Sequence, residues 1–115
     1  MKILSRKNKP FRKQGHYYFT EYGSSPASVS LVFINDNNLD QTPDRKHYHK
    51  KGYEFYVTVQ GKGMLDVNGQ LIDLLPESVV MVEPGEKHFV KDVLKTPFSM
   101  VIFNTVNKNE DKVEI

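Results

Sequence analysis

The sequence has 115 residues, of which 38% are hydrophobic and 26% charged, with a formal net charge of +2 and no cysteine. This length fits one domain with a single core, and the composition excludes a disordered chain. No apolar run approaches the roughly 18 residues that span a bilayer, so we expect no membrane association. Without cysteine the chain has no disulfide, zinc–thiolate site or thiol nucleophile. The N-terminal apolar run is too short for a signal peptide, and we therefore expect a cytoplasmic protein.

The N-terminal segment is strongly basic. A basic arm can bind phosphate groups, but charged chain ends are commonly solvated, and no RNA-binding motif of basic and aromatic residues accompanies this one. We interpret residues 1–14 as a solvated leader and expect no nucleic-acid partner. The basic residues of the leader are Lys2, Arg6, Lys7, Lys9, Arg12 and Lys13.

Short β-branched and apolar segments, separated by turn residues, follow the leader. Tyr17–Tyr22 is expected as a first strand and Val29–Ile34 as a buried second strand. A loop at Gly23–Pro26 separates these two strands, and a polar connection at Asp40–Lys46 leads to the next strand. The other predicted strands are His47–His49, Glu54–Val59, Met64–Val67, Gln70–Leu74, Val79–Val82, Lys87–Val93 and Phe98–Phe103.

The turn signals between these strands are specific. Asn68-Gly69 is a strong hairpin signal, Gly61-Lys62-Gly63 is expected to break a strand, and Pro84-Gly85 predicts a tight turn. No segment has a sustained helical period. The pattern therefore predicts an all-β antiparallel sandwich or small barrel in one domain, ending in a polar, frayed tail at residues 107–115.

Histidine is scarce, and two of the four stand close together. His47 and His49 are two apart, so on a strand both imidazoles project from the same face. Two buried imidazoles are costly as structural residues, because they lose solvation when unpaired and repel when protonated. Glu54 can reach that face across the following turn, and His88 comes from a later strand pair. Three imidazoles and one carboxylate favour one divalent transition metal, namely Mn, Fe, Co, Ni or Zn, with coordination positions left open.

The segment around these residues resembles the first motif of the cupin family. That motif has two histidines separated by one residue, a glutamate five residues after the second histidine and a glycine seven after the glutamate. Here the matching positions are His47, His49, Glu54 and Gly61. The resemblance implies that the first three are metal ligands.

The segment Val82–His88 is similar to the second cupin motif, which is a proline–glycine turn followed by a histidine three residues beyond the glycine. The family proline usually stands two before the glycine, where this chain has Glu83, and Glu77 replaces an earlier family glycine. The ligand His88 is kept. The resemblance implies a cupin-type antiparallel β-barrel, also called a double-stranded β-helix or jelly roll, over residues 15–106.

The resemblance also sets the range of functions. Cupins of this kind include metal-dependent dioxygenases, sugar isomerases and epimerases, decarboxylases, and non-catalytic modules that bind or sense a sugar or another small molecule. Our first hypothesis is a metal-dependent enzyme acting on an oxygen-rich small molecule, and the alternative is a non-catalytic sensing module. In an isomerase Tyr56, which shares the Glu54 face of its strand, would shuttle the proton; a core tyrosine with a satisfied hydroxyl is the simpler reading.

The outer face of one predicted strand indicates an assembly. Alternation leaves Phe55, Val57 and Val59 outside the barrel, and such an apolar stripe is costly when exposed in a monomer. Small single-domain cupins usually pair barrel to barrel. We therefore expect a homodimer with these residues at or near the interface.

Overall fold

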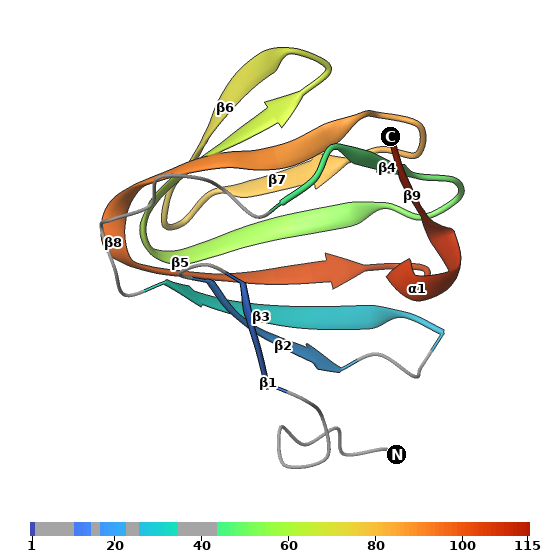
Figure 1. Cartoon of the computed structure of the whole chain (residues 1–115), viewed down its shortest axis with the longest axis horizontal. Coiled ribbons are helices and arrows are strands. Elements are labelled where there is room, and N and C mark those ends of the chain that lie inside the picture. Colours follow the sequence, from blue (N-terminus) through green and yellow to red (C-terminus); the bar gives the residue numbers. More distant parts are fainter. Residues whose placement is uncertain (2–10, 15–16, 23–25, 35–43) are drawn as a thin grey trace.

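The computed structural model describes residues 1, 11–14, 17–22, 26–34 and 44–115. Strands dominate these residues, and the helix among them is a single turn (Figure 1), which confirms the all-β prediction. None of the described helices is long and apolar enough to cross a membrane. The elements are β1 (Phe11–Gln14), β2 (Tyr17–Tyr22), β3 (Ser28–Ile34), β4 (His47–His49), β5 (Glu54–Val67), β6 (Gln70–Leu74), β7 (Val79–Val82), β8 (His88–Asn104), α1 (Lys108–Asp111) and β9 (Lys112–Glu114).

The described strands form one sheet that folds into two layers. The first half of β5 pairs with β7 and with the second half of β8. β8 pairs in turn with β3, β3 with β2, and β2 with β1. The second half of β5 pairs with β6 and with the first half of β8, which continues to β4 and β9. All these pairings are antiparallel. Because β5 and β8 take part in both layers, their bends close the barrel (Figure 1).

Two long strands replace four shorter ones predicted from the sequence. Gly61-Lys62-Gly63 was expected to end a strand, but β5 runs through it and only its pairing register with β8 shifts there. Gly61 has φ +82, and a Cβ on it would lie 2.5 Å from the carbonyl oxygen of Lys95. Glycine therefore permits the strand to bend against β8 and continue. In the same way β8 joins the two strands expected at Lys87–Val93 and Phe98–Phe103.

Both chain ends differ from expectation where they are described. Residues 11–14, predicted as part of a solvated leader, form β1 and pair with β2. The polar segment 107–115, predicted to fray, contains α1 and β9, because Asn107 caps the helical turn and β9 pairs with β4. Residues 2–10, 15–16, 23–25 and 35–43, which include His16 and most of the basic leader, lie outside the described residues.

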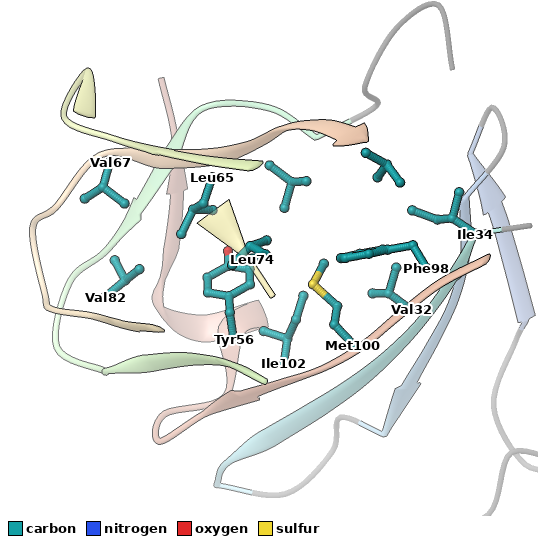
Figure 2. Packing of buried hydrophobic residues seen from close by; sticks show 12 residues of the cluster. Val32, Ile34, Tyr56, Leu65, Val67, Leu74, Val82, Phe98, Met100 and Ile102 are labelled. Atoms are coloured by element: carbon teal, nitrogen blue, oxygen red, sulfur yellow. The ribbon is translucent and has the colours of Figure 1, made fainter. Parts of the chain in front are cut away.

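The interior of the barrel has an apolar part and a polar part. On β3 and β5 every second side chain is buried over most of the strand, as a one-sided strand requires. Each buried side chain of the size of Phe98 or Leu65 stabilises the fold by about 1.5–3 kcal/mol. The apolar cluster (Figure 2) comprises Val32, Ile34, Tyr56, Leu65, Val67, Leu74, Val82, Val90, Val93, Phe98, Met100 and Ile102. On β5 the buried side chains on either side of Tyr56, those of Glu54 and Thr58, are polar.

Candidate metal centre

β4 places both of its histidines inside the barrel. His47 and His49 are 4% and 2% exposed, whereas Tyr48 between them is half-buried on the opposite face. β4 pairs with β8 at His47 and His88, so the third histidine lies directly beside the first. The imidazole centroids of His47 and His88 are 4.3 Å apart, and those of His47 and His49 are 5.2 Å apart. Strand pairing thus brings three imidazoles together from two distant segments of the chain.

The turn before His88 forms despite its shifted proline. The amide of Glu86 donates to the carbonyl of Glu83 at 3.2 Å, with Pro84 and Gly85 between them. Gly85 has φ +84, so the turn has proline and glycine where a type II turn needs them. The Gly85 amide also donates to the carbonyl of His49 at 2.9 Å. The second motif therefore docks on the first through its backbone.

Glu54 is the centre of the polar contacts. Its Oε1 lies 2.7 Å from His88 Nε2, 3.3 Å from His49 Nε2 and 3.9 Å from His47 Nε2. Tyr56 Oη donates to the same Oε1 at 2.7 Å. The other carboxylate oxygen, Oε2, accepts a hydrogen bond from Asn104 Nδ2 at 2.8 Å. The four residues predicted as ligands therefore converge on one buried point.

The outer nitrogens of two histidines have backbone partners. Nδ1 of His47 lies 2.6 Å from the carbonyl oxygen of Arg45, and Nδ1 of His88 lies 2.8 Å from that of Glu86. A carbonyl only accepts, so each Nδ1 carries a proton, and a ring whose Nε2 is deprotonated presents the Nε2 lone pair to the interior. Neither nitrogen of His49 has a hydrogen-bond partner, although the ring is buried.

The charges of the site depend on one another. Burial by itself would raise the pKa of Glu54, but its polar contacts with the three histidines outweigh burial and hold the pKa well below its usual value. Burial by itself would lower the pKa of His88, but its hydrogen bond to Glu54 raises the pKa above the usual value. Burial and the neighbouring Glu54 charge raise the pKa of Tyr56 well above 10.0, so its hydroxyl stays protonated.

The four side chains fit a transition-metal ion. One donor atom from each of His47, His49, Glu54 and His88 can be chosen so that all lie within 4.8 Å of one another. Donors bound to one ion at about 2.0–2.2 Å lie at most about 4.4 Å apart, so small side-chain movements suffice. Nε2 of His49 is buried without a hydrogen-bond partner, and a bound cation would coordinate its lone pair. The donor set of three imidazoles and a carboxylate could therefore hold a divalent ion.

Three further acidic or amide residues near the site were missed from the sequence. Asn104 ends β8 and holds Glu54, and Asp111 in α1 has Oδ2 4.0 Å from His49 Nδ1. Asp44 accepts a hydrogen bond from the Val90 amide at 2.6 Å, and burial raises its pKa. The spacing of Asn107 and Glu110 was a signal for the helical turn that carries Asp111. Nothing in the local sequence marks Asn104.

The folded antiparallel barrel with its interior histidines and glutamate defines this protein as a cupin. The profile of the AraC-like ligand binding domain matches residues 29–103, and the chain therefore belongs to that family. No curated protein matches the sequence.

Solved structures agree on the fold. Pac13 from Streptomyces, a nucleoside dehydratase, superposes with a TM-score of 0.77 at 14% identity, over 100% of this chain and 91% of that one. A Klebsiella pneumoniae protein with a double-stranded β-helix domain gives 0.71 at 15% identity, over 99% and 96%. KdgF from Halomonas sp. gives 0.66 at 10% identity, over 95% and 99%. At such identities the likeness shows the fold alone.

Proposed function

We propose that this protein binds one divalent transition metal through His47, His49, Glu54 and His88 and is a metal-dependent enzyme acting on an oxygen-rich small molecule. The observation that carries the proposal is the convergence of these four buried side chains around Glu54 Oε1. A bound ion would act as a Lewis acid toward an oxygen atom of the substrate. The reaction is either of the dioxygenase type or of the sugar isomerase or epimerase type.

The protein's own residues would manage protons beside the ion. Tyr56 keeps its proton because burial raises its pKa, and its hydroxyl donates a hydrogen bond to Glu54 Oε1, so it would act beside the ion as a hydrogen-bond donor and not as a base. The raised pKa of Asp44 makes this carboxyl the better candidate for taking up a proton. The likeness of the barrel to a nucleoside dehydratase supports a polar, oxygen-rich substrate.

A second candidate is a binding module that senses a small molecule without turnover. The observation that favours it is the match to the AraC-like ligand binding domain over residues 29–103. Both candidates place the ligand inside the barrel. Since a fold of this kind can carry either activity, the fold by itself does not decide between them.

Metal binding is tested with two single substitutions on β4. His49→Ala removes a donor and should weaken the affinity for Zn²⁺ or Ni²⁺, measured by isothermal titration calorimetry, by more than about 100-fold, since even losing a residue behind a ligand costs about 10–100-fold. Tyr48→Phe changes the neighbouring residue on the opposite face and should leave the affinity unchanged. Full affinity in His49→Ala would exclude the site.

The reaction class is tested on the protein with its own metal, identified by elemental analysis. Oxygen uptake with candidate substrates over a redox-active metal indicates a dioxygenase, and exchange of sugar protons with solvent indicates an isomerase or epimerase. Tight binding of sugars or organic acids with no turnover of any of them would contradict the enzyme proposal and support the sensing module.

A further inference from the structure

One of the three interior histidines lacks the support that the other two have. His47 and His88 each direct Nδ1 to the carbonyl oxygen two residues earlier. His49 makes no such bond, and neither of its nitrogens has a hydrogen-bond partner although only 2% of the residue is exposed. A neutral imidazole that binds a metal through Nε2 carries its proton on Nδ1. His49 therefore needs an acceptor on its outer side.

An acceptor close to this nitrogen comes from the C-terminal segment. Oδ2 of Asp111 lies 4.0 Å from His49 Nδ1, and this residue is 2% exposed. The separation exceeds a hydrogen bond by about 1 Å and is short for a bridging water, whose two bonds are each about 2.8 Å long. A small rotation of the imidazole would join the two groups directly.

The turn between β4 and β5 holds the Asp111 carboxylate in place. The amides of Lys51 and Gly52 donate to Oδ1 and Oδ2 at 2.9 and 2.8 Å, and the amide of Lys50 donates to the Asp111 carbonyl oxygen at 3.1 Å. A Cβ on Gly52 would lie 2.9 Å from Oδ2, so glycine is what lets the turn close around this carboxylate. Each carboxylate oxygen can accept a second hydrogen bond, and Oδ2 is the oxygen nearer His49.

We infer that Asp111 is a positioning residue of the metal centre: it accepts the Nδ1 proton of His49 and orients Nε2 of that ring toward the ion. The inference rests on the proposed metal binding, and it makes α1 and β9 part of the site. A carboxylate behind a ligating histidine fixes its ring and raises its basicity, and losing it typically weakens metal affinity by about 10–100-fold.

The test compares Asp111→Asn with Glu110→Gln in the full-length, ¹⁵N-labelled, zinc-loaded protein. Asn keeps the shape of the Asp111 side chain but loses its charge. Glu110→Gln makes the same change at the exposed neighbouring residue and serves as the control. Asp111→Asn should lower zinc affinity about 10–100-fold, move the His49 Nδ1 proton signal upfield and speed its exchange with water. The Nδ1 signals of His47 and His88 should stay in place, which separates the effect from general loosening. Glu110→Gln should match the wild type.

The outcomes are separable. If the wild type binds no zinc, the proposed metal centre fails and this inference fails with it. If the wild type binds zinc but Asp111→Asn changes neither affinity nor the His49 signal, only the inference is overturned. If Asp111→Asn does not fold, the zinc-loaded wild type decides: a downfield, slowly exchanging His49 Nδ1 proton supports Asp111 as its acceptor, and a rapidly exchanging one refutes it.

Discussion

At the residue scale, two buried polar side chains of the barrel interior differ in whether they have a partner. Asn104 Nδ2 donates to Glu54 Oε2 at 2.8 Å, whereas Thr58 Oγ1 has no hydrogen-bond partner. Removing a donor from a buried carboxylate leaves the oxygen unsatisfied, whereas removing a hydroxyl that bonds to nothing loses no interaction.

We expect Asn104→Leu to lower the free energy of unfolding of the metal-free protein by about 1–3 kcal/mol, measured by urea denaturation. Thr58→Val, which is equally buried, should leave this free energy unchanged or raise it. Equal losses in both variants would contradict the view that Asn104 acts through its bond to Glu54.

The shifted pKa values of Glu54 and His88 predict how stability without metal depends on pH. The pKa of His88 is raised above 6.5, so its contribution is fully present below pH 6.5 and is lost as the pH rises through the folded value. The pKa of Glu54 is held below 4.5, so its contribution is present above pH 4.5 and is lost as the pH falls through the folded value. The Glu54–His88 pair therefore stabilises the metal-free protein most between pH 4.5 and pH 6.5.

We expect the urea midpoint of the metal-free protein, measured with a chelator present, to fall from mildly acidic to mildly alkaline pH. Glu54→Gln removes the charge that raises the His88 pKa, so this decline should become shallower in that variant. An unchanged slope would show that another group governs the pH dependence.

At the element scale, two type II turns differ at their third residue, where the positive φ of this turn favours glycine. In the turn Glu83–Glu86 this position holds Gly85, with φ +84. In the turn Leu75–Ser78 the Ser78 amide donates to the Leu75 carbonyl at 3.1 Å, and Glu77 stands there with φ +69. A side chain in this left-handed region costs about 1 kcal/mol or more. Glu77 is also where the sequence departs from the family glycine.

We predict that Glu77→Gly raises the free energy of unfolding by about 1 kcal/mol, because glycine adopts this conformation without strain. Glu77→Ala keeps the Cβ and should give no such gain, so the pair separates backbone strain from loss of the exposed carboxylate. Thermal unfolding with both variants would measure this, and a gain in Glu77→Ala equal to that in Glu77→Gly would count against strain.

Local patterns predicted these elements well but not their ends. Asn68-Gly69 makes the expected hairpin with φ values of 51 and 86, because two left-handed residues are a local requirement. Gly61 also matched its family position, yet the strand continues past it, because the bend depends on the approach of Lys95 and Pro97 from β8. Whether a glycine ends a strand or bends it is decided by the strand beside it.

At the scale of the whole molecule, the four residues that converge could be predicted because histidine is scarce and the histidines and Glu54 stand at the spacing of the cupin motifs. Asp111 and Asn104 were missed because they reach the site through contacts 59 and 50 residues away in sequence, with Gly52 and Glu54. An isolated Asp or Asn in a polar segment looks like a surface residue until the fold places it. The four residues that converge were therefore predictable from the sequence, but Asp111 and Asn104, which lie beside them, were not.

The outer face of one layer carries apolar side chains on neighbouring strands. Phe55 on β5 lies opposite Met81 on β7 and Phe103 on β8, and Val57 lies opposite Val79 on β7. The rings of Phe55 and Phe103 are 6.2 Å apart, while Val79 and Met81 are 60% and 47% exposed. Contiguous apolar surface of this kind is commonly covered by a partner.

The homodimer expected from Phe55, Val57 and Val59 accordingly remains our prediction, with this outer face joined to that of a second copy. Phe103→Glu places a charge on this face beside Phe55, at a residue that is 38% exposed, and should convert the dimer into a monomer in light scattering at micromolar concentration. Leu71→Glu on β6 in the other layer, at 49% exposed, should remain dimeric, because its side chain lies away from this face. Buried charge without a partner opposes association strongly, so the contrast between the two variants should be large. A wild-type protein that is a stable monomer under the same conditions would refute the dimer, and a monomeric Leu71→Glu would place the interface elsewhere.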